Sequence, residues 1–227
     1  MPPFRTSCVR LPDIPLTMKT TLASILIIVC APWAFGVADP TTSEPKPPCC
    51  REGLPPAKYS EKSLYGLKSV WTSDVGREVK LEVLRGRPQV IALFFTQCQH
   101  SCPLIVADMK AIYLALPRGV REKVDFLLVS IDPARDTPEV LRAFRAKHEL
   151  PTERWTLLRG STEATRELAT MIGFNYQPGS PTQYAHSLLI SIINESGEIV
   201  FQQVGIGRGP GDAVKALVKT PQTKPRR

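Results

Sequence analysis

Two long apolar runs mark the centre of the chain. Residues 89–96 (QVIALFFT) and 124–131 (VDFLLVSI) carry apolar side chains at nearly every position. A strand with one wet face would alternate apolar and polar residues, whereas a strand covered on both faces is apolar throughout. We therefore predict two buried strands in the middle of a sheet.

Helical spacing follows each of these runs. Between residues 103 and 116 the apolar positions recur every three or four residues, which predicts a helix. Asp136, with Glu139 three residues later and proline in the first turn, is typical of a capping box and predicts a helix that runs to about residue 148. Two further helices are expected over 163–172, after Ser161, and over 210–218.

The remaining apolar segments are short and separated by turn residues. They predict hairpins over 69–84 and 187–204 and a short strand over 155–158. Strands that alternate with helices in this order favour a central sheet with helices on both faces. The expected fold class is α/β, with a central mixed sheet flanked by helices and an N-terminal β-hairpin extension.

The first 38 residues have a different pattern. Met18 and Lys19 precede an apolar run over 20–38 that ends in small residues. This layout is typical of a signal peptide, with Met18 as the natural start, and it predicts export. An N-terminal membrane anchor is the alternative, because the run approaches the roughly 20 residues of a spanning helix. Pro32 and the small residues at the end favour cleavage.

Proline and charge define the other boundaries. Residues 39–58 are rich in Pro, Ser and Thr and suit a linker, so the globular domain is expected over 59–219 and a basic tail over 220–227. The 227 residues hold 29 Lys and Arg against 21 Asp and Glu, a net charge of +8. Because the basic residues are scattered among acids, we expect no nucleic-acid binding.

The six cysteines fall into three groups. Cys8 and Cys30 precede the domain, and the adjacent pair Cys49 and Cys50 lies in the linker, as a second redox or metal pair or as incidental thiols. Within the domain only Cys98 and Cys102 remain. An exported domain with so few cysteines is no disulfide scaffold, which favours a functional role for this pair.

Cys98 and Cys102 lie where a buried strand passes into a helix. Ligands gather beyond the carboxyl ends of strands in open α/β sheets, and a helix N-terminus lowers the pKa of a thiol. The i, i+4 spacing predicts both thiols on one helical face, able to form a disulfide or to bind one soft metal ion. His100, between them, is expected to face solvent. Two cysteines packed as core residues are the structural alternative.

Three segments together resemble the SCO/SenC family: the CxxxCP motif after an apolar strand, the segment VSIDPARDTP, and the segment YAHSLLISI. Members of that family are thioredoxin-like copper chaperones of cytochrome c oxidase assembly, and the resemblance covers about residues 59–217. It implies a thioredoxin-like fold and copper ligation by Cys98, Cys102 and His186. The family's paired aspartates correspond to Asp132 and Asp136, for which a role in copper release or partner docking stands beside a structural role in the turn.

The resemblance implies a copper cargo, as Cu(I), Cu(II) or both. The expected function is delivery of copper to the binuclear copper site of cytochrome c oxidase subunit II. The alternative is a thiol–disulfide oxidoreductase in which Cys98 and Cys102 reduce partner cysteines. Other copper chaperones or thiol reductants are further expected partners, and the expected location is the bacterial periplasm or the outer face of the cytoplasmic membrane. Zinc is disfavoured because the sequence shows no fourth ligand.

Overall fold

The structure is a computed structural model that describes residues 59–180 and 183–221. The predicted signal peptide or anchor, the linker with Cys49 and Cys50, and most of the basic tail lie outside the described residues. Within the described ranges, no helix is both long enough and apolar enough to cross a membrane.

A mixed sheet of seven strands forms the centre of the domain, in the order β2-β1-β5-β4-β3-β8-β9. The strands β3, β4 and β5 run parallel, and the others join them antiparallel. All side chains of β3 and β4 are buried, as the two apolar runs predict. The bounds are β1 (Val70–Ser73), β2 (Glu78–Lys80), β3 (Gln89–Phe94), β4 (Asp125–Ser130), β5 (Trp155–Arg159), β8 (Leu189–Ile193) and β9 (Ile199–Val204).

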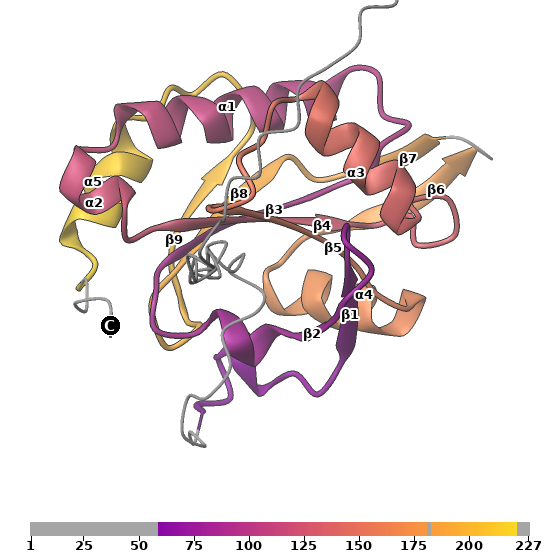
Figure 1. Cartoon of the computed structure of the whole chain (residues 1–227), viewed down its shortest axis with the longest axis horizontal. Helices are drawn as coiled ribbons and strands as arrows, with labels where there is room; N and C mark the ends of the chain where they lie inside the picture. Colours follow the sequence, from indigo (N-terminus) through magenta and orange to yellow (C-terminus); the bar gives the residue numbers. More distant parts are fainter. Residues whose placement is uncertain (1–58, 181–182, 222–227) are drawn as a thin grey trace, which may run out of the picture. The chain divides into compact units, whose positions relative to one another are not determined.

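Helices cover both faces of this sheet (Figure 1). The crossovers from β3 to β4 and from β4 to β5 advance in one direction, so right-handed connections place their helices, α1 and α3, on one face. The chain then returns past β3 to β8, which places α4 on the other face, and α5 packs beside α1. The predicted α/β class is confirmed. The helices are α1 (Ser101–Ala115), α2 (Arg118–Arg121), α3 (Pro138–Lys147), α4 (Thr162–Met171) and α5 (Gly211–Lys219).

The N-terminal hairpin is present but shorter than predicted. Its strands β1 and β2 pair antiparallel, with Trp71 opposite Val79. The second arm ends at Lys80, because Leu81–Leu84 forms a 3-10 turn (η3), as does Leu64–Gly66 (η2). Since β1 also pairs with β5, the hairpin extends the central sheet by two strands.

The predicted capping box at Asp136 is wrong. Helix α3 begins one residue later, and Thr137 is its N-cap, with the Thr137 hydroxyl accepting the Val140 N–H at 3.4 Å. The Asp136 side chain turns into the domain and is fully buried. It accepts hydrogen bonds from Thr96 and Ser130, both on or next to central strands. Such distant partners cannot be recognised from the local spacing of Asp136 and Glu139.

A second, two-stranded sheet was not predicted. It consists of β6 (Tyr176–Ser180) and β7 (Gln183–His186), with Tyr176 opposite His186. Its sequence is interrupted by Pro178 and Gly179 and shows no apolar–polar alternation, so it carries no strand signal.

Three segments distant in sequence meet at one edge of the central sheet. Phe94 at the end of β3 pairs with Ser130 at the end of β4, so the loops that follow these two strands lie side by side. Because β8 is antiparallel to β3, its first residues reach the same edge, as the pairing of Ala92 with Ile190 shows. His186 is thereby brought next to the turn that holds Cys98.

Candidate metal-binding site

Cys98, Cys102 and His186 form one cluster. A sulfur from each cysteine and a ring nitrogen of His186 all lie within 4.8 Å of one another. Within the described residues, this is the only group of three or more His, Cys, Asp or Glu side chains arranged to hold a metal ion. The structure therefore brings together the three candidate ligands that the sequence analysis names, from the turn after β3, the first turn of α1 and the end of β7.

Cys98 is not on the helix, so the prediction that both thiols share one helical face is wrong. It lies in a turn in which its N–H donates to the Phe95 carbonyl at 3.2 Å. Its sulfur accepts the N–H of Cys102, at 3.3 Å. The first N–H groups of a helix lack partners within the helix, and the Cys98 sulfur satisfies one of them as a cap would.

The two thiols differ in their acidity. Burial opposes ionisation of Cys98, but the Ser101 hydroxyl and the backbone N–H groups of Cys102 and His100 hydrogen-bond to its sulfur, and the net result lowers the pKa of Cys98 to about 6. Burial raises the pKa of Cys102 far above its ordinary value, and the neighbouring Cys98 adds to this increase. At neutral pH the pair therefore consists of one thiolate and one thiol.

The ring of His186 is oriented by a carbonyl and two aromatic rings. Its Nδ1 lies 2.8 Å from the Ser187 carbonyl oxygen. A carbonyl can only accept, so Nδ1 carries the proton and the lone pair of Nε2 faces the thiols. Phe174 stacks on the imidazole at 5.9 Å, and Phe95 meets it edge-on at 5.8 Å. The nitrogen that a metal needs is thus presented in one tautomer.

Asp136 anchors the cysteine side of the site. Its carboxylate accepts the Thr96 hydroxyl at 2.5 Å, the Thr96 N–H at 3.2 Å and the Ser130 hydroxyl at 2.5 Å. Thr96 lies two residues before Cys98, so these bonds hold the turn that carries the thiolate. Burial raises the pKa of Asp136, while the three donors oppose that increase.

Asp132 anchors the histidine side. Its carboxylate is 2 % exposed, forms an ion pair with Arg135 and accepts the Tyr184 hydroxyl at 3.3 Å. Tyr184 and His186 are two residues apart on β7 and so point to the same face of the strand. The burial of Asp132 and Asp136 argues against direct docking of a partner on either carboxylate. Their contacts support a role in positioning the ligands.

Sequence reasoning missed Ser101 and Tyr184, although both stand beside recognised motif residues. Tyr184 had a usable signal in its two-residue spacing from His186. Ser101 had none, because its role depends on a histidine 85 residues away. His100 is exposed, as predicted, and is not part of the cluster.

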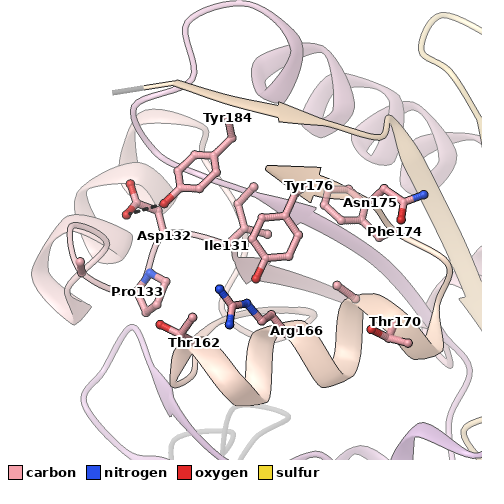
Figure 2. A pocket seen from close by; sticks show the side chains of 12 residues that line it. Ile131, Asp132, Pro133, Thr162, Arg166, Thr170, Phe174, Asn175, Tyr176 and Tyr184 are labelled. Carbon is pink, nitrogen blue, oxygen red and sulfur yellow. Dashed lines mark hydrogen bonds between the residues drawn. The ribbon is translucent and has the colours of Figure 1, made fainter. Parts of the chain in front are cut away.

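A pocket of about 400 Å³, drawn in Figure 2, lies between the loop after β4, helix α4 and the sheet β6–β7. Tyr184 forms part of its wall, with the hydroxyl hydrogen-bonded to Asp132, and the guanidinium of Arg166 points toward the hydroxyl of Tyr176. Phe174 lines the pocket and also stacks on His186. The ligands themselves lie outside the pocket, which borders them through these aromatic rings.

The fold and the site define a class of protein: a thioredoxin-like domain with a dithiol–imidazole cluster at the carboxyl edge of its sheet. The family model described as SCO1/SenC matches residues 58–219, and the chain belongs to this family.

Relatives of known description agree with this assignment. A Stutzerimonas stutzeri protein described as copper-binding is 26% identical over 140 residues, which cover 62% of this chain and 62% of the relative. The chain thus spans under two thirds of that relative's length. A SCO1 protein homologue of Bacillus subtilis (strain 168) is 26% identical over 153 residues, covering 65% of this chain and 78% of the relative. The structure of Bradyrhizobium japonicum ScoI with copper bound shares the fold, with a TM-score of 0.56 and 22% identity over 67% of this chain and 97% of that chain.

Proposed function

We propose that this chain is a copper-binding chaperone that holds copper at Cys98, Cys102 and His186. The observation that carries the proposal is the cluster itself, in which two sulfurs and one imidazole nitrogen lie within 4.8 Å. Thiolates are soft ligands that favour Cu(I), and an imidazole completes a three-coordinate site. The description of the Stutzerimonas relative and the copper-bound ScoI structure support copper as the cargo.

The proposed destination is the binuclear copper site of cytochrome c oxidase subunit II, reached outside the cytoplasmic membrane. The family supplies the support for this partner. The site suits transfer because Cys98 is 9 % exposed and His186 is partly exposed, so an incoming ligand can reach the ion from their side while Cys102 stays fully buried.

A copper titration of the reduced full-length chain tests the proposal. We expect one Cu(I) per chain, loss of tight binding in Cys98→Ser and Cys102→Ser, and weaker Cu(II) binding with a changed spectrum in His186→Ala. His100→Ala is the matched control, since this exposed histidine lies between the cysteines but outside the cluster. A chain that binds no copper while it rapidly reduces a disulfide peptide would overturn the proposal.

The asymmetric thiols favour a second candidate, thiol–disulfide exchange. The Cys98 thiolate would attack a partner disulfide, forming a mixed disulfide and releasing one partner thiolate. Cys102, after losing its proton, would attack the Cys98 sulfur, release the second partner thiolate and leave a Cys98–Cys102 disulfide. Two electrons pass to the partner. His186→Ala separates the candidates, because plain exchange needs only the two sulfurs whereas copper binding uses the imidazole.

A further inference from the structure

Ser101 lies between two of the three ligands. Its hydroxyl oxygen is 3.3 Å from the Cys98 sulfur and 3.2 Å from Nε2 of His186. It is the first residue of α1 and is partly buried, so its side chain points into the cluster from the helix end. The hydroxyl therefore contacts one donor atom from the turn after β3 and one from β7.

The oxygen of the Ser101 hydroxyl has lone pairs that can face a metal ion. A serine oxygen donates one hydrogen bond and has two lone pairs, so Ser101 cannot donate to Cys98 and Nε2 together. When the Nε2 lone pair is used by an ion, Ser101 loses that acceptor and its oxygen is free to face the ion. The hydrogen can then point to the Cys98 thiolate.

The distances from the Ser101 oxygen to Cys98 and His186 suit three donors that share one metal ion. Donor atoms at right angles, each about 2.0–2.3 Å from an ion, lie about 3 Å apart. The distances of 3.3 Å and 3.2 Å from the Ser101 oxygen to Cys98 and His186 are close to this value. Neighbouring oxygens are already engaged: Asp136 accepts from Thr96 and Ser130, and the Tyr184 hydroxyl donates to Asp132.

We propose that the Ser101 hydroxyl is a fourth donor for Cu(II) and is not a ligand of Cu(I). This proposal rests on the proposed copper-binding function. Cu(II) favours four donors in a tetragonal arrangement and accepts oxygen, whereas Cu(I) favours the soft thiolates. Ser101 thereby sets the relative affinity of the site for the two oxidation states of its cargo.

Comparison of the full-length wild type with Ser101→Ala and Ser101→Thr tests this assignment. In the alanine variant we expect about tenfold weaker Cu(II) binding and shifted electron paramagnetic resonance parameters, with a much smaller loss of Cu(I) affinity from the missing hydrogen bond to Cys98. The threonine variant, which keeps a hydroxyl, should restore Cu(II) affinity. His100→Ala should match the wild type in every measurement, because it alters the same loop outside the cluster.

Equal weakening of Cu(I) and Cu(II) in Ser101→Ala would overturn the assignment, since it would mean that the hydroxyl only hydrogen-bonds to the Cys98 thiolate in both states. An alanine variant identical to the wild type would also overturn it. Failure of the wild type to bind copper at all would instead refute the proposed function. A cooperative urea unfolding transition of the metal-free alanine variant, like that of the wild type, serves as the check that it is folded.

Discussion

The two thiols of the motif have different environments, although only three residues separate them. Cys98 is 9 % exposed and its sulfur accepts several hydrogen bonds, whereas Cys102 is fully buried in the core. The first arrangement stabilises a thiolate and the second a thiol. This difference makes the free energy of unfolding depend on pH.

For the metal-free reduced protein, we expect Cys98 to increase the free energy of unfolding as the pH rises from about 6 toward 9. The folded pKa of Cys98 is about 6 and its ordinary value is 9.0, so between them the unfolded chain binds more protons. Above that window the raised pKa of Cys102 has the opposite effect. Urea unfolding of the wild type and Cys98→Ala across this range measures the difference. A difference that is constant with pH would contradict the prediction.

Asp136 is the residue whose loss should cost most stability near the site. Removal of its carboxylate leaves the hydroxyls of Thr96 and Ser130 without their acceptor, and each buried unsatisfied group costs about 1–3 kcal/mol. We expect Asp136→Ala to lower the free energy of unfolding by about 3 kcal/mol. Glu139→Ala, at an exposed position of α3, should change it little. Equal effects of the two substitutions in urea unfolding would restore the capping-box interpretation.

At the scale of elements, the short sheet β6–β7 decides where His186 lies. It is separate from the seven-stranded sheet, so its position depends on side-chain contacts. Tyr184 provides two of them: its ring packs on Phe95 at 5.1 Å and its hydroxyl donates to Asp132. The loop after β4 is thereby connected to the strand that carries the imidazole.

Tyr184→Phe should weaken copper binding without unfolding the domain. The substitution keeps the ring contact with Phe95 and removes only the hydroxyl that reaches Asp132, so the imidazole is held less firmly. We expect Cu(II) affinity to fall by about threefold to tenfold in a chelator competition. Tyr176→Phe is the matched control on the facing strand β6, and its hydroxyl lies beside Arg166 instead. Equal affinities of the two variants would exclude this role for Tyr184.

At the scale of the whole molecule, the site joins segments that are far apart in the chain. Cys98 and Cys102 are neighbours in sequence and can bind an ion even in the unfolded chain. His186 comes from β7 of the two-stranded sheet and joins them only in the folded protein. Binding that favours the folded state stabilises it, by about 2.7 kcal/mol at a free ligand concentration of 100 times Kd.

Copper should therefore stabilise the wild type more than His186→Ala. In the variant the two thiols bind the ion about as well before and after unfolding, and most of the gain is lost. We expect a clear rise in Tm on addition of Cu(I) to the reduced wild type and a much smaller rise in His186→Ala. Calorimetry of both proteins with and without Cu(I) checks this. Equal increases would mean that the imidazole contributes nothing to Cu(I) binding.

Local patterns in the sequence were sufficient to predict the central strands, the position of the two thiols and the start of α4. The apolar runs predicted β3 and β4 because strands buried on both faces need apolar residues at every position. The position of CxxxCP after such a strand identified the thiols, since the carboxyl edge of a sheet is where ligands gather. Ser161 marked the start of α4, where its hydroxyl accepts the Ala164 N–H at 3.1 Å.

Tertiary structure alone decided how the site is assembled. The inward turn of Asp136, the formation of β6–β7 and the position of Ser101 between Cys98 and His186 all depend on partners far away in the chain. No spacing of neighbouring residues encodes such contacts. The spacing of neighbouring residues named Cys98 and Cys102 as candidate ligands, and the family resemblance added His186. Folding decided which thiol ionises, which histidine nitrogen faces the thiols and which hydroxyl lies beside them, because burial and hydrogen bonding are properties of the packed chain.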